Sequence, residues 1–335
     1  MPLTRLPACL AIVAVVVLLA SCGSTDKADT DDPATESSTP GAFPVTLENR
    51  FGSTTIDAEP ERIVTVGWND QDFVLALGLV PVSIRDWFEE YATYPWVTEV
   101  TGGAELPTFG DEIDYEKIAA ARPDVILALA TWDEISEKTY EKLSAIAPTV
   151  LQPTEYGTDA LPWDVQTRIT GQVLGLEDEA DALVTKVEDR IDEVKNDHPE
   201  FAGQTLVVDY GPSDEGHWLV PAGDPRRALF DALGFEAQEH EGDLSTERLD
   251  LLDEDVLVVF GALPDDLAGD RSFTSLDVVS EGRTVYISWD STLAGAMSFS
   301  GPQALLYALD QIAPQLANAA DGDPGTKVDV FEAAA

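Results

Sequence analysis

Short apolar runs alternate with amphipathic segments from Phe43 onward, and this pattern predicts how the chain is organised. Runs of three to five residues rich in Val and Ile are typical of strands buried on both faces of a parallel sheet. In the first half, these runs predict strands at residues 63–66, 80–84, 125–129 and 149–151. The segments between and after them predict helices at residues 70–77, 114–121 and 133–146. Regular alternation of strand and helix indicates an α/β lobe with a mostly parallel sheet.

A second cycle of the same kind follows in the other half of the chain. Its apolar runs predict strands at residues 205–209, 256–260 and 284–287. Its helical segments lie at residues 225–233, 246–252 and 301–313. We therefore predict an α/β protein with two Rossmann-like lobes, at residues 43–175 and 199–320, and a flexible tail at 321–335.

One long amphipathic segment separates the two cycles. Its apolar residues stand at helical spacing and are Ala180, Leu183, Val184, Val187, Ile191 and Val194. A helix over residues 179–196 would be roughly 27 Å long. We expect this single long helix, within residues 176–198, to join the lobes and run along both of them. An ordinary surface helix of one lobe is the alternative.

The first 21 residues have one charge, Arg5, followed by an apolar run over residues 6–20. A charged start, an apolar middle and small residues at the end are the layout of a secretory signal. The run is shorter than the roughly 20 residues that span a bilayer. Ala20-Ser21-Cys22 resembles a lipobox, in which the cysteine becomes the lipid-modified N-terminus. We expect a signal peptide at 1–21 and lipidation of Cys22; an ordinary signal with a nearby cysteine is the alternative.

Residues 22–42 consist largely of Ser, Thr, Asp, Pro and Ala, and predict a disordered tether after the lipidated cysteine. Removal of residues 1–21 leaves Cys22 as the only cysteine, so no disulfide forms within the mature chain. The protein is therefore expected to be extracytoplasmic and held on the outer face of the cell membrane by its lipid anchor alone.

Charge narrows the range of partners. The chain has 19 Lys and Arg against 63 Asp and Glu, a formal net charge of −44. Such a surface repels nucleic acid and anionic lipid headgroups. We expect no nucleic-acid partner, no membrane contact beyond the anchor, and a monomer.

Aromatic residues concentrate in the loops that follow the predicted strands. Open α/β sheets bind ligands in the crevice beyond the carboxyl ends of their strands. Six of the seven Trp fall in these loops, with several Tyr and Phe: Trp68, Trp87, Phe88, Tyr91, Tyr94, Trp96, Trp132, Tyr210, Trp218 and Trp289. This pattern predicts a wide, aromatic-lined ligand cleft between the lobes, suited to a bulky ligand.

Motifs for catalysis or metal binding do not stand out. The three His residues, His198, His217 and His240, are far apart, and no Cys pair or His-Glu-x-x-His accompanies them. We expect His217 to be a solvated loop residue, with ligand contact as the alternative. A nucleophile elbow, a P-loop and a dinucleotide fingerprint are missing from the sequence. We therefore expect no enzyme, no protein-held metal and no resident cofactor; an exported enzyme is the weaker alternative.

Several blocks of sequence share the pattern of one known group of proteins. They lie at residues 60–64 (Pro-Glu-Arg-Ile-Val), 75–82, 115–118 (Tyr-Glu-Lys-Ile), 122–126 (Arg-Pro-Asp-Val-Ile), 143–150, 229–235 and 244–249. The chain from Phe43 to Leu316 thereby resembles the substrate-binding lipoproteins of iron-siderophore and cobalamin ABC importers. The resemblance implies two lobes with a helical spine, a ferric siderophore as ligand, and the permease of an ABC importer as partner. Haem and cobalamin are the alternative cargoes.

The same resemblance implies that Glu116 and Glu247 dock against arginines of the permease. Each residue lies in the first turn of a predicted helix. A carboxylate there interacts favourably with the helix dipole, by about 0.3–1 kcal/mol, so helix stabilisation is the simpler role. Both roles are compatible.

Few cations lie near the predicted cleft. Arg85 follows the second strand, and Arg226 and Arg227 begin a later helix. Guanidinium groups pair with several oxygens of an anionic ferric complex, and aromatic rings add stacking contacts. Surface ion pairs with neighbouring carboxylates are the alternative for Arg226 and Arg227. The expected ligand-binding set is Trp68, Arg85, Trp87, Tyr91, Trp132, Tyr210, Trp218, Arg226 and Trp289.

Overall fold

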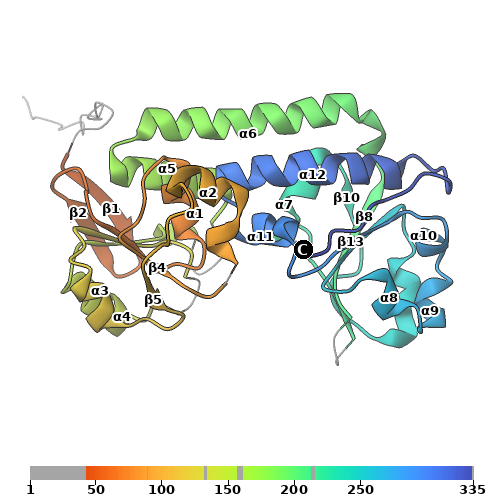
Figure 1. Ribbon diagram of the computed structural model, residues 1–335, viewed down its shortest axis with the longest axis horizontal. Coiled ribbons are helices and arrows are strands. Elements are labelled where there is room, and N and C mark those ends of the chain that lie inside the picture. Colours follow the sequence, from red (N-terminus) through yellow and green to blue (C-terminus); the bar gives the residue numbers. More distant parts are fainter. Residues whose placement is uncertain (1–42, 89, 132–133, 157–160, 213–215, 334–335) are drawn as a thin grey trace, which may run out of the picture. The chain divides into compact units, whose positions relative to one another are not determined.

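A computed structural model describes residues 43–88, 90–131, 134–156, 161–212 and 216–333 (Figure 1). The predicted signal peptide, Cys22 and the tether lie outside these residues, as does Trp132. Within the described part of the chain, none of the helices combines the length and apolar character needed to cross a membrane.

The N-terminal half contains a five-stranded parallel sheet in the order β5-β4-β3-β6-β7. Its strands are β3 (Ile63–Thr65), β4 (Ser83–Arg85), β5 (Thr108–Gly110), β6 (Val125–Ala128) and β7 (Thr149–Leu151). Val64 and Ile126 pack with α3 (Tyr115–Ala120) and α4 (Glu137–Ser144), and Ile63 and Leu127 pack with α5 (Trp163–Leu174). Because both faces are covered by helices, the strand β6 is apolar and buried at every position.

The C-terminal half contains a six-stranded sheet with β8 (Thr205–Tyr210), β12 (Val256–Phe260) and β13 (Thr284–Ile287) as parallel neighbours. β10 (Glu236–Ala237) pairs with β8, and β9 (His217–Leu219) runs antiparallel to both β8 and β11 (Gly242–Leu244). One face packs against α12 (Pro302–Ala320) and α7 (Ala228–Leu233). The other packs against η5 (Thr246–Leu252), α8 (Pro264–Leu267), α9 (Arg271–Thr274) and α10 (Asp277–Ser280).

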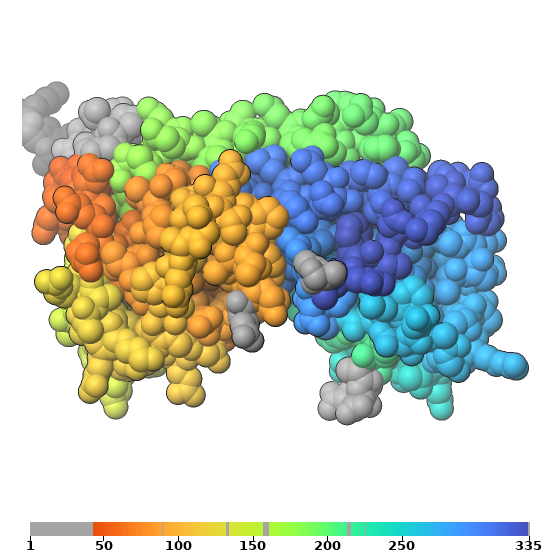
Figure 2. All heavy atoms as spheres, viewed as in Figure 1, coloured from red at the N-terminus to blue at the C-terminus, as the bar shows by residue number. Residues whose placement is uncertain are grey.

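The long helix α6 (Glu177–Asp197) joins the two halves, as predicted. It packs on α5 in the N-terminal half and on α7 and α12 in the C-terminal half; α6 and α12 lie side by side (Figures 1 and 2). At the turn between α5 and α6, a Cβ on Gly171 would lie 2.4 Å from the Cβ of Ala180, so only glycine permits this approach. α12 forms a second connection, because it also contacts α1 (Asp70–Ala76) and α2 (Pro95–Thr101).

Several predicted elements have different ends in the structure. The strand expected at 80–84 begins only at Ser83, because Pro81 has no N–H to donate to a ladder. The helix expected from 133 begins at Glu137, where Ser136 is the N-cap and its hydroxyl accepts from Thr139 N. The helix expected at 225–233 is a 3₁₀ turn, η4 (Pro225–Arg227), followed by α7.

The closing helix was predicted to stop at 313, before Pro314, but α12 continues to Ala320. Leu316 and Ala319 are fully buried in the core beyond Pro314. Burial of this apolar face outweighs the loss of one backbone hydrogen bond at the proline.

Other elements were not predicted from the sequence. They are the hairpin of β1 (Val45–Asn49) and β2 (Gly52–Ile56), η1 (Tyr91–Thr93), α2, β5, η2 (Thr154–Tyr156), α5, η3 (Pro199–Phe201), β9, β10, β11, α8, α9, α10 and α11 (Thr292–Phe299). The segment expected as a flexible tail also makes ordered contacts. Phe331 N donates to Tyr286 O at 2.9 Å, and Ser288 N donates to Phe331 O at 2.8 Å, so Phe331 pairs with the end of β13.

Candidate ligand-binding site

Two tryptophans from neighbouring loops form one aromatic wall. β3 and β4 are adjacent parallel strands, so the loops that follow them emerge at the same edge of the sheet. The rings of Trp68 and Trp87 meet edge-on with centroids 5.6 Å apart, and Trp87 Nε1 donates to Trp68 O at 2.6 Å. Both residues are half-buried, so each keeps part of its ring accessible.

Phe299, at the end of α11, extends this wall from the C-terminal half. Its ring centroid lies 5.1 Å from that of Trp87 and 4.4 Å from that of Tyr91. Asn69 Nδ2 donates to Phe299 O at 3.0 Å. Sequence analysis missed Phe299, because it stands in an apolar stretch with nothing to distinguish it from core. These contacts show that the loops after the N-terminal strands reach the C-terminal half.

A second aromatic wall lies at the carboxyl edge of the C-terminal sheet. The ring of Tyr210, at the end of β8, lies 5.0 Å from that of Trp289 and 6.0 Å from that of Trp218, centroid to centroid. Trp289 is 43% exposed, and Val80 is the other large apolar residue exposed among those described. In the space-filling view the surface is hollowed between the orange and yellow atoms of the N-terminal half and the cyan atoms of the C-terminal half (Figure 2).

Gly261 allows Trp289 to lie over the end of β12. It has a φ of +87°, and a Cβ at this position would lie 2.1 Å from Trp289 Nε1. A side chain here would therefore both strain the backbone and displace the indole ring.

Arg85 is committed to protein partners, contrary to the open cation expected from the sequence. Its side chain is 5% exposed, and its NH1 and NH2 donate to the two carboxylate oxygens of Glu134 at 2.7 and 3.3 Å. Its Nε donates to Asp111 O at 2.7 Å, and its guanidinium lies 3.5 Å from the ring centre of Trp68. Glu134 lies 49 residues away, which is why the sequence did not reveal the pairing.

The two arginines of η4 have different roles. Arg226 is partly exposed and donates to both carboxylate oxygens of Asp224, at 2.8 and 2.6 Å, while its guanidinium lies 4.4 Å from the ring centre of Trp218. Burial alone would raise the pKa of Asp224, but the hydrogen bonds from Arg226 outweigh it and lower that pKa. Arg227 is fully buried and donates to Asp231 and Gln238, so it supports the fold and has no surface at the site.

Tyr91 lies in a buried contact between the two halves. It is 4% exposed, and its hydroxyl donates to Asp72 Oδ1 at 3.0 Å. Trp96 Nε1 donates to the same oxygen at 2.8 Å, and the backbone N of Gly301, the N-cap of α12, donates to Asp72 Oδ2 at 2.9 Å. In this structure Asp72 therefore links α1 to α12, and Tyr91 is buried against it with little surface to offer a ligand.

Asp70, also on α1, holds two of the site loops together. Its Oδ2 accepts from the backbone N of Gly67 and of Leu129, each at 3.0 Å. Its Oδ1 accepts from Ala130 N at 3.1 Å and from Gln166 Nε2 at 2.9 Å. Sequence analysis missed both aspartates, because in so acidic a chain a carboxylate near a helix start carries no signal.

Burial raises the pKa of Asp70 and of Asp72 from 3.8 to about 6, although the hydrogen bonds to each carboxylate oppose the shift. We therefore expect the protein to lose stability as the pH rises from 5 to 7. Such a carboxyl binds its proton more tightly in the folded state than in the unfolded state. Its contribution to stability is therefore fully present below the pKa of the unfolded state, and it is lost as the pH rises through the pKa of the folded state. Each group is expected to change the free energy of unfolding by about 1–3 kcal/mol over this window, measured by urea denaturation at each pH.

Repulsion between surface carboxylates also grows with pH, so the measurement is made in 0.5 M NaCl, which screens exposed charges but not buried ones. Asp70→Asn removes one titrating group and should reduce the slope by about half. A free energy of unfolding that increases from pH 5 to pH 7 in high salt would contradict the raised pKa values.

His217 is buried, so the expectation of a solvated loop residue is wrong. It is 4% exposed, and its Nδ1 lies 2.6 Å from Oδ2 of the fully buried Asp209. Burial raises the pKa of Asp209, and the contact with His217 opposes this shift. The pair links β9 to β8 inside the C-terminal sheet, and we assign it a structural role.

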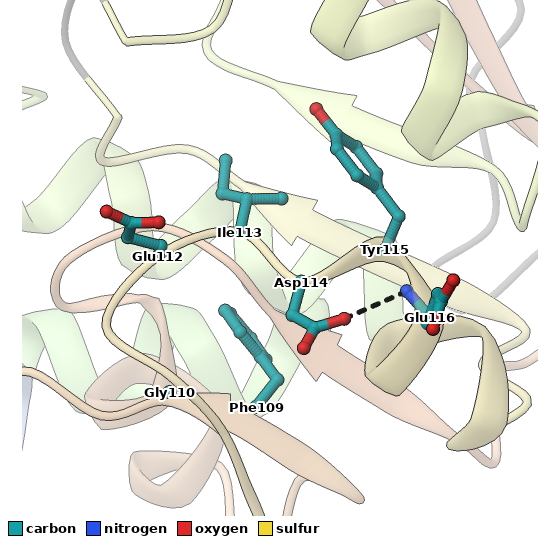
Figure 3. Close-up of a pocket in the computed structure, with 7 residues that line it drawn as sticks. All are labelled: Phe109, Gly110, Glu112, Ile113, Asp114, Tyr115 and Glu116. Atoms are coloured by element: carbon teal, nitrogen blue, oxygen red, sulfur yellow. Dashed lines mark hydrogen bonds between the residues drawn. The ribbon is translucent and has the colours of Figure 1, made fainter.

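Glu116 and Glu247 are both exposed. Glu116 lies in the first turn of α3, where Asp114 is the N-cap and accepts from the backbone N of Glu116 and of Lys117, each at 3.0 Å. Glu247 lies in η5, whose bounds match the short helix expected at 246–252; it is a 3₁₀ segment with non-helical backbone angles at Arg248. Glu116 borders an open surface hollow of about 490 Å³, lined also by Phe109, Gly110, Glu112, Ile113, Asp114 and Tyr115 (Figure 3).

Among the residues that the structure describes, no three His, Cys, Asp or Glu side chains are grouped so as to hold a metal ion. Trp132, expected at the site, falls in one of the gaps in the described chain. The described part of the candidate site therefore consists of two aromatic walls, with Arg226 against Tyr210 and Trp218 of the second wall.

Comparison with known proteins points to one family. A profile described as periplasmic binding protein matches residues 63–287. The probable siderophore-binding lipoprotein YfiY of Bacillus subtilis is 24% identical over 237 residues, which cover 70% of this chain and 68% of that protein.

Solved structures share the whole fold. A periplasmic solute binding protein from Mycobacterium smegmatis aligns with a TM-score of 0.75 and 32% identity, over 83% of this chain and 99% of that one. The iron-uptake protein PiaA of Streptococcus pneumoniae, crystallised in complex with ferrichrome, aligns with a TM-score of 0.69 and 25% identity, over 83% and 99%.

Proposed function

We propose that this chain, which belongs to the periplasmic binding protein family, captures a ferric siderophore outside the cell membrane and delivers it to the permease of an ABC importer. The observation that carries the proposal is the pair of aromatic walls at the carboxyl edges of two parallel sheets. Such an edge is where open α/β sheets bind ligands, and rings that remain partly exposed suit a bulky chelate. The ferrichrome complex of PiaA supports this class of ligand.

The location outside the membrane rests on the N-terminal sequence. We infer that residues 1–21 are removed, that Cys22 carries the lipid, and that residues 22–42 tether a monomeric binding unit to the membrane. The lipoprotein name of the relative YfiY supports this inference.

Ligand contact is assigned to the accessible rings of both walls and to the arginine against the second wall: Trp68, Trp87, Tyr210, Trp218, Trp289 and Arg226. Trp132 is included because of its place in the sequence, in the segment that follows β6. Arg85 and Tyr91 act as positioning residues, because Arg85 supports the ring of Trp68 and Tyr91 anchors Asp72.

Docking on the permease is assigned to Glu116 and Glu247. Both carboxylates are exposed on short helical segments that precede a buried strand, one in each half of the chain. Positive side chains of a permease would recognise two such carboxylates at a fixed separation.

The proposed function is tested by titrating the mature chain, from residue 22 and with Cys22→Ser, while tryptophan fluorescence is followed. The panel contains ferric hydroxamates, ferric catecholates, ferric citrate, haem and cobalamin. We expect saturable quenching by a ferric chelate and none by its iron-free form. Saturation only by haem or cobalamin would replace the proposed ligand, and no response to any of them would reject the proposal.

Trp289→Ala is expected to weaken binding of the ferric chelate by about 10- to 100-fold, because interface tryptophans contribute about 1.5–3 kcal/mol when they anchor a ligand. Trp289 is 43% exposed, so the accompanying loss of fold stability should stay within about 2–3 kcal/mol. Isothermal titration calorimetry measures the affinity without depending on the indole that is removed.

Val80→Ala is the matched control, since Val80 is 47% exposed but precedes β4, at the opposite end of the strand from the site loops. This variant should bind the chelate with unchanged affinity. Equal affinities for wild type and Trp289→Ala would remove Trp289 from the binding surface.

A further inference from the structure

Both guanidinium groups near the aromatic walls have their charge balanced within the protein. Arg85 is buried against Glu134, with Trp68 over its face, and Arg226 is held by both oxygens of Asp224. An anionic ligand would have to displace Glu134 to pair with Arg85, and at Arg226 it would meet a charge already balanced by Asp224. Displacing Glu134 would also leave an unpaired charge beside a side chain that is only 5% exposed.

The loops that follow the strands of both sheets add further negative charge. Exposed carboxylates in them include Asp86, Glu90, Asp111, Glu112 and Asp290. The described parts of these loops contain no Lys or Arg apart from Arg85 at the end of β4 and the pair Arg226 and Arg227 in η4, of which Arg227 is buried and paired with Asp231. The sequence has no Lys or Arg at positions 89, 132–133, 157–160 or 213–215 either. The rim of the candidate site is therefore net negative.

We propose that the site selects a ferric chelate that is electrically neutral or cationic, of the trihydroxamate type, and rejects polyanionic catecholate and carboxylate complexes. This inference rests on the proposed function. It corrects the expectation that arginines of the cleft pair with an anionic complex.

The chemistry of the chelating groups explains why charge separates these ligands. Three hydroxamates each lose one proton, so their complex with Fe³⁺ is neutral unless the backbone of the chelator carries a charge. Three catecholates each lose two protons, so their complex carries three negative charges. In the field of a negative rim a trianion is repelled, whereas a neutral complex binds through stacking on the rings and through hydrogen bonds.

Calorimetric titration of the mature Cys22→Ser chain at 0.05 and 0.5 M NaCl tests the selection. The probes are ferrichrome, which is neutral, ferrioxamine B, which carries one positive charge, and ferric enterobactin, which carries three negative charges. At low salt we expect at least one hydroxamate complex to bind at least about 30-fold more tightly than ferric enterobactin. The ratio of the two dissociation constants should decrease at high salt, because salt screens the repulsion of the trianion.

Glu134→Gln removes the nearer of the two carboxylates around Arg85, leaving only Asp111 Oδ1 at 3.7 Å, while preserving the shape of the side chain. It should raise the affinity for ferric enterobactin relative to ferrichrome by about 10-fold. Asp181→Asn is the matched control, because Asp181 is likewise the carboxylate partner of an arginine, Arg168, but lies on α6 away from the site. This control should leave the ratio unchanged.

Ferric enterobactin binding the wild type as tightly as the hydroxamate complexes would overturn the inference and leave the proposed function standing. An unchanged ratio in Glu134→Gln would equally overturn it. Binding of none of the three ferric complexes would overturn the inference, and the proposed function would then depend on ferric citrate and the other ligands of the wider panel.

Discussion

Reversing the charge of both glutamates that we propose for docking, with Glu116→Lys and Glu247→Lys in one protein, is expected to reduce siderophore-dependent iron uptake about 100-fold or more. Like charges brought together at an interface cost several kcal/mol, and these two side chains are exposed and make no contact with the aromatic walls. The dissociation constant of the ferric chelate should therefore stay the same. Uptake of radiolabelled iron by cells and calorimetry of the purified variant measure the two effects separately.

The control for this experiment is Glu137→Lys. Glu137 is also an exposed glutamate in the first turn of a helix, α4, after a capping residue, Ser136. Its reversal changes the charge at a helix start as each of the two test substitutions does, and uptake should be unaffected. Weaker chelate binding in the double variant would place the two glutamates at the ligand site and end the docking assignment; normal uptake would end it as well.

Asp72→Ala is expected to lower the free energy of unfolding by about 3–5 kcal/mol. The substitution leaves the Tyr91 hydroxyl, the Trp96 indole and the Gly301 backbone N buried without their acceptor. It also removes a negative charge from the N-terminus of α12, where the helix dipole favours it. Urea denaturation followed by circular dichroism measures the loss.

Asp86→Ala provides the comparison, because Asp86 is an exposed aspartate in the loop directly after β4. Its removal should change the free energy of unfolding by less than about 0.5 kcal/mol. Asp72→Asn should be intermediate, since the amide keeps the size of the carboxylate but turns one of its two acceptor groups into a donor. A loss below about 1 kcal/mol in Asp72→Ala would show that the contact between α1 and α12 does not depend on this carboxylate.

Strands with both faces buried were the most predictable part of the fold. β7, β12 and β13 have the bounds expected from the sequence, because a strand covered by helices on both sides needs an apolar residue at almost every position. The hairpin of β1 and β2 was missed, since its residues are mixed in polarity and only some of them are buried. Helix ends were less predictable, because they depend on tertiary packing. α12 continues past Pro314 because its apolar face is buried in the core of the C-terminal half.

At the candidate site, residue types were predictable and their partners were not. The aromatic loops were predictable because the strands were predictable, and the segment that follows each strand lies at the carboxyl edge of the sheet. The sequence did not reveal that Arg85 is paired with Glu134, or that His217 is buried on Asp209. Each of these pairings alters the charge that the site offers to a ligand or changes the role of the residue.

The sequence by itself determined the α/β class, the two cycles of strand and helix, the long connecting helix and the aromatic character of the loops. All of these follow from patterns within short windows, where the apolar spacing reports local burial. Only the tertiary structure decided which charges remain available and what links the two halves. Asp72 and Gly301 lie 229 residues apart, and such contacts arise from packing of complete elements, which no local pattern encodes.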